Sequence, residues 1–532
     1  MSEKDNQGPV KRFTSELDYI IFGVGFAITA LAVVGFALRE EQASAVMESI
    51  NSFLWTELSW LYLLIMFIVV VFVAFLTIGP WGKIKLGRED EDPEFSYLAY
   101  FVMLYSAGTA AGVVFWGPAE AIFHYETPSP LVGAEPMSRE AAVGAIQYSY
   151  FHWGLSAWSA YVVTAIPIAY FAYRYDAPMR ISTIITPWVG IDRLNSFWAK
   201  IIDIIAVFAT IGGVATTLGL VGSQFLVGLD YVAGVELGDE GTVILITGLT
   251  VAFTLSVATG IKKGIRRISY FNMGLFAVLT GVAFIAGPTM YILATGTEAL
   301  GNYLNQFVTM SLYTNAGGDP GWVGNWTIFF WAWWFSWAPF VGLFIARISR
   351  GRTVRQVTIT GVIASTGVTI PWYATMGGSA IFLQDTDRAD ILGVINQYGG
   401  EEAAAGYPLF EALPLGGLLT AMFLVLVTTF FITSADSSTL ALGMLTTGGN
   451  ETPSTINRVI WGGLIGLLAS VLMVVGGVEA LQAAAIITGG PFSIVLLIAI
   501  GSMALMFNKH HAILTNKEED VPSIDEIPSN DD

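Results

Sequence analysis

The residues best suited to binding a ligand are aromatic side chains within a long apolar segment. From Trp326 to Phe340 the chain reads WTIFFWAWWFSWAPF, with five tryptophans inside twelve residues. On a helix with about 100° per residue, Phe330, Trp334 and Trp337 share one face. Several aromatic faces around one cavity attract a cation that donates no hydrogen bonds, such as a trimethylammonium group.

A second aromatic set lies in the apolar segment 142–172, where Trp153, Trp158 and Tyr161 follow one another at helical spacing. On one continuous helix, the Tyr161 ring falls between the two indoles. Interfacial belts are the usual place for tryptophan in membrane proteins, but Trp333 and Trp334 lie well inside their segment. Two interpretations stay open: ring packing in the protein interior, and cation binding between the two segments.

Oxygen ligands for an alkali cation are concentrated at the end of segment 413–435, which leads into the run FFITSADSS. There the hydroxyls of Thr433 and Ser434 are adjacent. Hydroxyl and carbonyl oxygens are the hard ligands that such a cation prefers. The alternative is that both hydroxyls bond to carbonyls of their own helix.

Small residues interrupt segment 96–123, which reads SAGTAAG from Ser106 to Gly112. Glycine lowers helix stability and lets a ligand or another backbone approach closely. This pattern therefore predicts a broken helix. The alternative is close helix packing through Gly108 and Gly112, which form a small-xxx-small pair.

Three carboxylates lie within or beside apolar segments, where an ionisable group is a functional hypothesis by default. They are Glu120, Asp203 and Asp436. We expect structural roles, with Asp436 bonded to nearby backbone or hydroxyl groups and Asp203 paired with arginines of a neighbouring loop. His152 borders the second aromatic set, and a proton relay is the alternative to a structural role for it.

Composition places all of these residues in a membrane. The chain is 54% hydrophobic and only 12% charged, whereas soluble domains are about 25% charged. Its apolar blocks reach about 20 residues, enough to cross a hydrocarbon core of about 30 Å. No cysteine is present, which excludes disulfides and thiolate chemistry. The chain has only four histidines and no glycine-rich phosphate loop, which argues against an enzyme. We expect a transporter, with an ion channel or a membrane sensor as alternatives, and no nucleic-acid partner.

The apolar blocks predict an all-α integral membrane protein with twelve transmembrane helices. The expected spans are 18–38, 58–80, 96–123, 142–172, 198–228, 242–260, 271–297, 324–347, 355–384, 413–435, 457–477 and 482–507. Helices 3–7 and 8–12 would form inverted five-helix repeats, an arrangement common in transporters. The expected division of the chain is 1–17, a cytoplasmic tail; 18–95, helices 1 and 2; 96–297, the first repeat; 298–323, an amphipathic helix and loop; 324–508, the second repeat; and 509–532, an acidic disordered tail.

The distribution of charge predicts the orientation. With a cytoplasmic N-terminus, all of the 24 Lys and Arg except Arg39, Arg139 and Arg388 fall on the cytoplasmic side. This bias follows the positive-inside rule. It predicts a protein of the cell membrane with both termini in the cytoplasm. The net charge of −18 arises largely from the outer loops and the C-terminal tail. It either attracts cations to the entrance or forms a general acidic surface.

Together these segments resemble the betaine/carnitine/choline transporter (BCCT) family. The run WTIFFWAWWFSWAPFVGLFIARISR from Trp326 to Arg350 is similar to the family's signature segment. The spacing of Trp153, Trp158 and Tyr161 matches its substrate box, and FFITSADSS and the glycine-interrupted third helix also fit. The resemblance covers roughly residues 15–508.

The resemblance implies a substrate site and two sodium sites. Its solute box would consist of Trp153, Trp158, Tyr161 and Trp334, with Trp337 on the inner pathway and Thr109 nearby. The ligands of the first sodium site would be Ser106, Thr109, Phe430, Thr433 and Ser434. A second sodium site would lie near Phe340 and the helix-5 threonines 210, 216 and 217. Family members are usually homotrimers, and Na⁺ would be the coupling ion without a further cofactor.

Two departures from the family pattern bear on the solute and on regulation. Many members read Gly-Met-Gly-x-Gly in helix 3, where this chain has Gly108-Thr-Ala-Ala-Gly112. Choline-type members often place Asp at the position of Gly112, so its absence favours a zwitterion such as glycine betaine. Choline, carnitine, ectoine and dimethylsulfoniopropionate stay open. The tail is acidic, so regulation through a basic C-terminal helix is not expected.

Sodium symport is favoured over sodium-independent exchange. Exchangers of this family fill a cation site with a basic side chain. No Lys or Arg lies between Lys200 and Lys262, so helix 5 has no such substitute for the ion.

Overall fold

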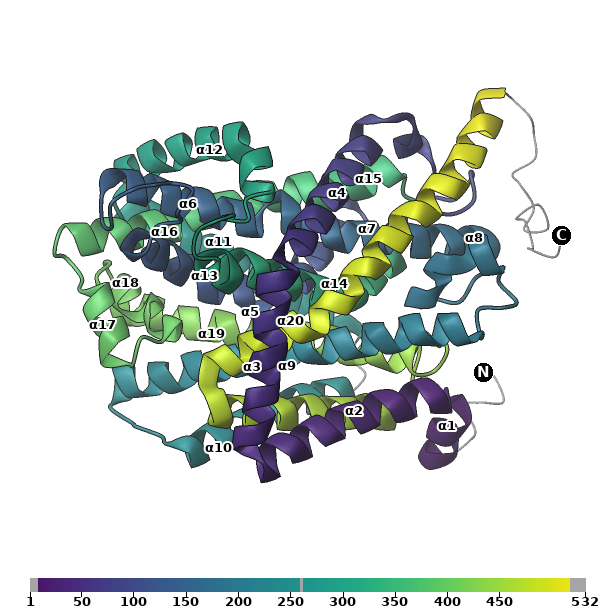
Figure 1. The fold of residues 1–532 in the computed structure, drawn as a ribbon, viewed down its shortest axis with the longest axis horizontal. Helices are drawn as coiled ribbons and strands as arrows, with labels where there is room; N and C mark the ends of the chain where they lie inside the picture. Colours follow the sequence, from purple (N-terminus) through teal and green to yellow (C-terminus); the bar gives the residue numbers. More distant parts are fainter. Residues whose placement is uncertain (1–7, 259–261, 517–532) are drawn as a thin grey trace.

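Helices make up most of the described part of the protein (Figure 1). The computed structural model describes residues 8–258 and 262–516; the side chains of 109–111, 239–240, 253, 255–258, 262–266, 433–434 and 511–516 lie outside that description. Within these ranges the regular structure is helical, apart from one isolated bridge between Lys85 and Thr353. The helices are α1 (Pro9–Glu16), α2 (Tyr19–Leu38), α3 (Glu40–Glu57), α4 (Ser59–Ile78), α5 (Tyr97–Glu126), α6 (Arg139–Trp153), α7 (Leu155–Tyr175), α8 (Thr186–Val189), α9 (Phe197–Ala233), α10 (Asp239–Ala258), α11 (Lys262–Ala286), α12 (Thr289–Ser311), α13 (Gly321–Val323), α14 (Phe329–Ile348), α15 (Val354–Thr358), α16 (Ser365–Asp385), α17 (Ile391–Gln397), α18 (Gly406–Glu411), α19 (Gly416–Leu445) and α20 (Thr455–Asn516).

Eight helical stretches of the described chain are long and apolar enough to cross a membrane, and the bent helix α5 makes a ninth. The helical membrane class is therefore confirmed. The expected spans do not all appear as separate long helices. Segments 457–477 and 482–507 both lie in α20, which is interrupted only by non-helical backbone at Gly476 and Gly477. Segment 355–384 is divided among α15, a π-helical turn (Ile359–Ala364) and α16.

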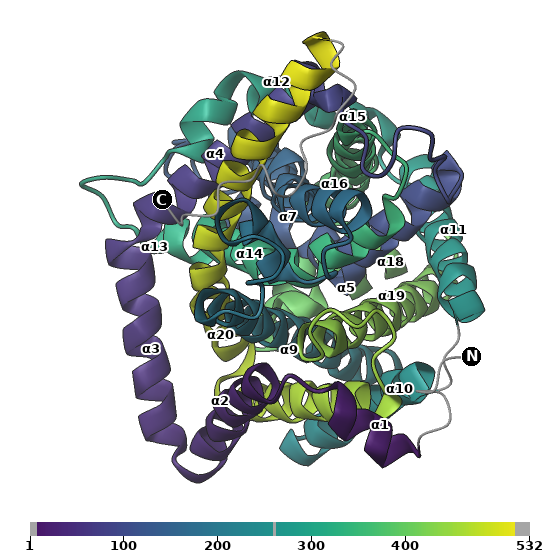
Figure 2. The ribbon, with the colours of Figure 1, turned by 90° about the vertical axis from the view of Figure 1, so that its right-hand side faces the viewer.

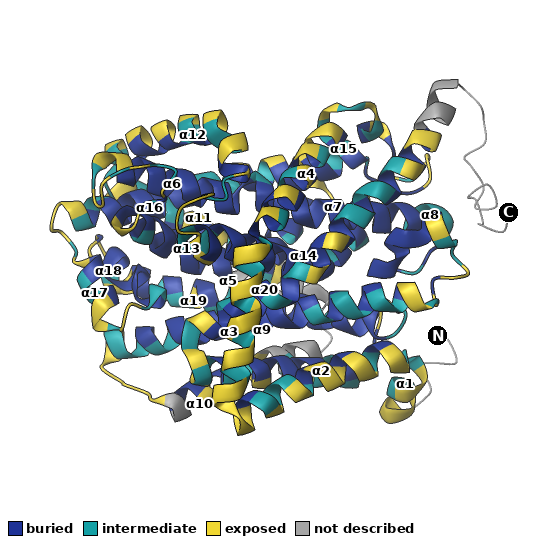
Figure 3. Ribbon diagram, in the orientation of Figure 1, coloured by how far each residue is buried: buried dark blue, intermediate teal, exposed yellow. Residues whose placement is uncertain are grey.

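The inner helices of the bundle are buried, and the outer helices expose apolar side chains. Helices α5, α7, α9 and α14 are largely buried, whereas α2 and α4 are exposed along one side (Figure 3). The exposed side chains on those outer helices include large apolar ones such as Leu31 and Val71. An apolar exterior is what contact with lipid tails requires. Helix α3 stands at one edge of the bundle (Figure 2).

Several segments expected on the cytoplasmic side contact one another. Arg174 pairs with Glu89 at 2.7 Å, and Arg350 pairs with Glu91 at 2.5 Å. Helix α1 and the end of α20 both lie at the right of Figure 1, whereas α12, α17 and α18 lie at the left. This arrangement has the two described ends of the chain on one side of the bundle.

The expectation of one continuous helix over 142–172 is wrong. Helix α6 ends at Trp153 and α7 begins at Leu155, with Gly154 in a non-helical conformation between them. A Cβ atom at position 154 would lie 3.1 Å from the Tyr303 hydroxyl. The break places Trp153 on a different helix from Trp158 and Tyr161, so their relative positions do not follow a helical wheel.

The expected boundary between helix 7 and the following amphipathic helix, at 297 and 298, is also corrected. Helix α11 ends at Ala286 and α12 begins at Thr289, because Pro288 has no N–H to continue the helical bonds. The buried positions of α12 recur at spacings of three, four or seven residues, as on one face of an amphipathic helix; they are Ile292, Thr295, Gly296, Ala299, Tyr303, Met310 and Ser311.

Helix α5 is broken where the small residues predict it. Its two parts, Tyr97–Gly108 and Gly112–Glu126, are bent by 62° relative to each other. The glycines at the break face aromatic rings. A Cβ atom on Gly108 would lie 2.6 Å from the Trp158 ring, and one on Gly112 would lie 3.2 Å from the Trp153 ring. The missing side chains therefore make room for side chains of α6 and α7, as well as permitting the bend.

We predict that Gly108→Ala destabilises the protein, since the added methyl group must displace the Trp158 ring. Overpacking of this kind costs about 1–3 kcal/mol, and the thermal unfolding midpoint in detergent should fall. Gly23→Ala in α2 is the matched control, because a Cβ atom there meets nothing within 4 Å. Equal midpoints for the two variants would show that the close contact at Gly108 is not as described.

Candidate solute-binding site

Four aromatic rings from three helices form a continuous buried cluster, which we call the aromatic box: Trp153, Trp158, Tyr161 and Trp334. The Trp153 and Trp334 rings are 4.7 Å apart and nearly perpendicular, at 73°. Tyr161 contacts Trp334 at 6.3 Å and Trp158 at 5.9 Å, again nearly perpendicular. Each ring is at most 2% exposed. The structure thus brings these four predicted site residues together.

Further rings that the sequence did not single out extend the aromatic box. Tyr105 of α5 stacks on Trp158 at 5.4 Å, and Tyr373 of α16 stacks on Trp153 at 5.4 Å. Both residues lie in apolar segments that contain other aromatic residues, such as Phe101 and Trp372. Nothing in their local spacing distinguishes them from ordinary packing residues.

Trp337 lies on the side of the aromatic box that faces α9. Its indole N–H donates to the Gly213 carbonyl at 3.2 Å, and the Trp333 indole donates to the same oxygen at 3.4 Å. Trp333 contacts both Trp337 and Trp153, at 6.1 and 6.0 Å. The predicted inner-pathway residue is therefore connected to the aromatic box through a neighbouring ring.

Three hydroxyls in this region are buried and have no hydrogen-bond partner among the described residues. They belong to Ser106 of α5, Tyr161 of α7 and Tyr373 of α16. Leaving a buried polar group unpaired costs about 1–3 kcal/mol. A ligand that offers an acceptor, such as a carboxylate, would remove that cost. The aromatic box thus combines cation-attracting faces with unpaired donors.

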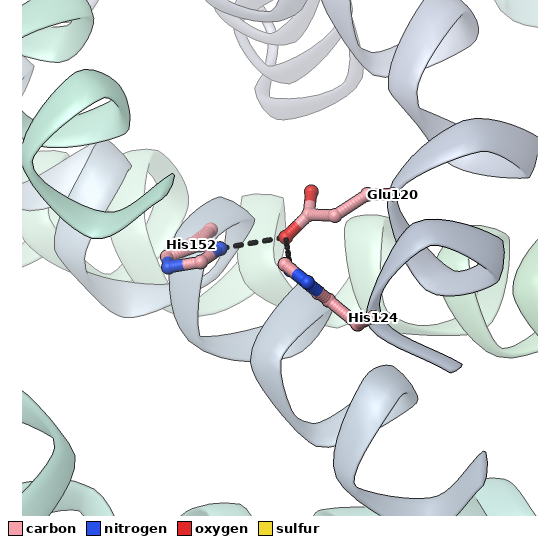
Figure 4. Close-up of side chains that lie close together, drawn as sticks. All are labelled: Glu120, His124 and His152. Carbon is pink, nitrogen blue, oxygen red and sulfur yellow. Dashed lines mark hydrogen bonds and ion pairs between the residues drawn. The ribbon is translucent and has the colours of Figure 1, made fainter. Parts of the chain in front are cut away.

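A buried carboxylate that the sequence did not connect to the aromatic rings holds one of them. The Oε2 atom of Glu120 accepts the Trp153 indole N–H at 2.6 Å. Its Oε1 atom lies 2.6 Å from Nδ1 of His152 and 3.3 Å from Nε2 of His124 (Figure 4). All four side chains are at most 2% exposed. The i,i+4 spacing of Glu120 and His124 was a usable local signal; their proximity to His152 was not visible in the sequence.

The same three groups have the spacing of a possible metal site, since their ligand atoms all lie within 4.8 Å of one another. Two ligands of one tetrahedral ion with bonds of about 2.0 Å are about 3.3 Å apart. The 2.6 Å contact between Glu120 and His152 is shorter and has the length of a charge-assisted hydrogen bond. His152 also bonds to the Thr327 hydroxyl at 3.1 Å. This geometry fits a hydrogen-bonded cluster better than a metal centre.

The predicted sodium ligands are distributed over α5, α14 and α19. The side chains of Thr109, Thr433 and Ser434 lie outside the described residues. Ser106 and Phe430 are buried in α5 and α19, two helices that pack against each other. Phe340 is buried in α14, with its ring 4.9 Å from that of Trp337.

The threonines expected at the second sodium site are buried in α9. The hydroxyls of Thr210, Thr216 and Thr217 each donate to the carbonyl four residues earlier, at 2.8, 2.9 and 3.0 Å. The Thr216 hydroxyl also lies 2.7 Å from the Leu481 carbonyl of α20. Back-bonding therefore engages their protons and leaves oxygen lone pairs.

The other two intramembrane carboxylates pair with arginines. Asp203 accepts from the backbone and hydroxyl of Ser182, at 2.8 and 2.7 Å, and lies 3.8 Å from Arg180, which confirms its expected pairing. The expectation for Asp436 is wrong. It pairs with Arg458 at 2.6 Å, because α20 carries that arginine back beside α19.

A cavity of about 610 Å³ lies next to the aromatic box. Phe329 lines it and stacks on Trp333 at 5.4 Å, so a layer of rings separates the cavity from Trp153. Three carboxylates from α3, a short 3₁₀ turn (Glu402–Ala404) and α20 also line it: Glu48, Glu402 and Glu479. Among the described residues that line the cavity, none is Lys or Arg. A cation is therefore favoured there over an anion.

The sequence matches a known family of membrane transporters. A family model described as "BCCT, betaine/carnitine/choline family transporter" matches residues 20–512. The glycine betaine transporter OpuD of Bacillus subtilis is 40% identical over 501 residues, which are 94% of this chain and 96% of that protein. An ectoine/hydroxyectoine transporter of Virgibacillus pantothenticus is 38% identical, over 93% of this chain and 97% of that one.

Solved structures resemble the chain more remotely. A Na⁺-coupled sialic acid symporter aligns with a TM-score of 0.48 and 12% identity, over 86% of this chain and 92% of that one. That similarity is too low to support a conclusion about coupling. The match over nearly the full length, together with the membrane helices that meet around the rings, identifies the protein: it is a membrane transporter of the betaine/carnitine/choline transporter family, not an enzyme.

Proposed function

We propose that the protein takes up a small quaternary-ammonium solute by sodium-coupled alternating access, with glycine betaine as the most favoured solute. The observation that carries this proposal is the aromatic box, in which rings from α6, α7 and α14 contact one another in the buried interior. Choline or carnitine transport and sodium-independent exchange within the same family are the alternatives.

The chemistry of the aromatic box suits a methylated cation. Each ring face contributes roughly 0.5–2 kcal/mol to binding a desolvated cation, so four rings could supply up to about 8 kcal/mol, the equivalent of micromolar affinity. The Trp153 and Trp334 rings contact each other in this structure. To bind an ammonium group between them, the two rings would have to move apart. The unpaired Tyr161 and Tyr373 hydroxyls would then be available to the carboxylate of a zwitterion.

Two features favour a zwitterion over choline. Gly112, where choline-type members often have Asp, lies against the Trp153 and Trp333 rings and leaves no room for a side chain. The relatives also point to zwitterionic solutes, since one is named for glycine betaine and another for ectoine. Competition between glycine betaine, ectoine and choline in one uptake assay would separate these solutes.

Sodium coupling is supported by the oxygen atoms near the break in α5. The Ser106 hydroxyl is buried and has no partner in the part of the chain that the structure describes, and α5 packs against α19, which carries Thr433 and Ser434. No basic side chain lies between Lys200 and Lys262 to replace an ion.

The finer topology also belongs to the proposal. Twelve spans, two inverted repeats, cytoplasmic termini in the cell membrane and assembly as a homotrimer stay predictions. The ion pairs between segments assigned to the cytoplasmic side support the orientation. In that orientation the acidic cavity faces outward and serves as the entrance for Na⁺ and solute.

We predict that Trp334→Leu abolishes saturable glycine betaine uptake, because it removes the ring that contacts both Trp153 and Tyr161. Any saturable uptake that remains in proteoliposomes should have an apparent KM at least about tenfold higher. Trp60→Leu is the matched control, since Trp60 is exposed on α4. An unchanged KM in a folded Trp334→Leu protein would exclude the aromatic box as the solute site.

An inward Na⁺ gradient should drive accumulation of labelled glycine betaine in proteoliposomes, and replacing Na⁺ by K⁺ should abolish it. The reason is that the proposed ligands are oxygen atoms without a built-in basic side chain. Uptake that needs only internal solute would instead indicate an exchanger. Equilibration without accumulation would indicate a channel.

The apparent affinity for Na⁺ should depend on pH through the acidic cavity. Burial, together with the carboxylates of Glu401 and Glu479, raises the pKa of Glu402 to about 7. Glu402 is therefore charged above pH 7 and protonated below it, so acidification removes one attractive charge. The KM for Na⁺ should rise roughly twofold between pH 8 and pH 6, the effect of one screened charge. In Glu402→Gln this component should be absent, with the higher KM at both pH values; a full pH effect in that variant would contradict the assignment.

A further inference from the structure

We propose that Glu120 is a positioning residue of the solute site, which holds the Trp153 ring in place through its indole N–H and strengthens that ring's attraction for a cation. This inference rests on the proposed role of the aromatic box. It concerns a residue that makes no direct contact with the solute, and its role would be exerted entirely through Trp153.

Both oxygens of the Glu120 carboxylate are held by donors or histidines from two helices. Oε2 accepts from Trp153 of α6 at 2.6 Å. Oε1 lies 2.6 Å from His152 of α6 and 3.3 Å from His124 of α5. Figure 4 shows the two histidine contacts of the carboxylate, and the Trp153 contact is short for an N–H···O hydrogen bond.

The Trp153 ring needs such a support because of its place in the chain. It is the last residue of α6, and the helix stops at Gly154, so no following turn of its own helix flanks it. On the other side, the second half of α5 approaches the ring twice. Gly112 would place a Cβ atom 3.2 Å from it, and Glu120 binds its N–H. Contacts with α5 therefore help to set the position of the ring, together with its packing against Trp334 and Tyr373.

The contact also changes what the ring can bind. An indole whose N–H donates to a carboxylate is polarised, because hydrogen bonds in a low-dielectric interior strengthen one another's charge separation. The polarisation places more negative charge on the ring face, and that face attracts a quaternary ammonium group. A neutral acceptor at the same position would hold the ring with less of this effect.

Trp334 provides a comparison within the same site. Its indole N–H donates to a backbone carbonyl, that of His152, at 2.9 Å. That bond is longer and its acceptor is uncharged. Of these two adjacent rings, Trp153 is the one whose binding strength should respond to the charge of Glu120.

The test measures glycine betaine binding to purified full-length protein in detergent by isothermal titration calorimetry. Glu120→Gln keeps the size of the side chain and an acceptor oxygen but removes the ionisable carboxyl group, and it should raise the Kd by about tenfold. Trp153→Phe keeps an aromatic face but has no N–H, and should raise the Kd by a similar factor. The Kd of the double variant should be no higher than the higher of the two single-variant Kd values, because both changes remove the same interaction.

Matched controls separate this role from a general loss of packing. Trp461→Phe removes a buried indole N–H that bonds to Thr446, the residue that follows α19, and Asp203→Asn removes a buried carboxylate that bonds to Ser182. Both should leave the Kd unchanged within twofold. A cycle of Glu120→Gln with Trp334→Phe should be additive, since those two residues share no hydrogen bond.

The outcomes distinguish the inference from the proposed function. If Trp334→Leu abolishes binding while Glu120→Gln leaves the Kd unchanged, the positioning role is overturned and the aromatic box stands. If neither variant changes the Kd, the aromatic box itself fails. Additive effects of Glu120→Gln and Trp153→Phe would also overturn the inference. Should Glu120→Gln not fold, Trp153→Phe alone decides, and an unchanged Kd in that variant overturns the proposal.

Discussion

The arrangement of the aromatic box depends on where buried indole N–H groups find their acceptors. In a membrane interior a donor without an acceptor is costly, and no water is at hand to replace it. Trp153 donates to a carboxylate, Trp334 to a carbonyl near the end of α6, and Trp337 to a carbonyl of α9. Each bond ties a ring to a different part of the bundle. The aromatic box is therefore held by polar contacts at its rim as well as by ring packing, and a change in any of these acceptors would move a ring.

The acceptors near the aromatic box are available because several helices are interrupted beside it. The end of α6 at Gly154 leaves terminal carbonyls without intrahelical partners, and one of its last carbonyls, that of His152, receives Trp334. The bend of 62° in α5 brings glycine backbone, instead of side chains, against the rings. Irregular backbone is tolerated in a membrane protein where it is enclosed by protein. Here the irregular backbone lies at the residues that contact the aromatic rings. The interruptions that weaken the helices therefore also provide the acceptors and the space that the aromatic box needs.

Part of the negative charge of the protein is concentrated at one cavity. A net charge of −18 would be compatible with a uniformly acidic surface, yet three carboxylates line one cavity beside the aromatic box. On the opposite side, arginines of the connecting segments pair with acidic residues of neighbouring segments. A cation entering by the cavity would meet negative charge first and aromatic faces next. Such a sequence of environments attracts the ion in water and then replaces its hydration in the interior.

The sequence alone determined the helical membrane class, the family, the break in α5 and the four residues that cluster as the aromatic box. These follow from the length of apolar blocks and from residue types at short spacing, which are local properties of the chain. Only the tertiary structure placed Trp153 on a separate helix from Trp158, paired Asp436 with Arg458, and added Tyr373 to the aromatic box. It also brought Glu120 to the indole of Trp153, 33 residues further along the chain. Pairings of this kind depend on how distant helices pack, and helical periodicity carries no information about which polar group will be the nearest acceptor once the helices have closed around a buried donor.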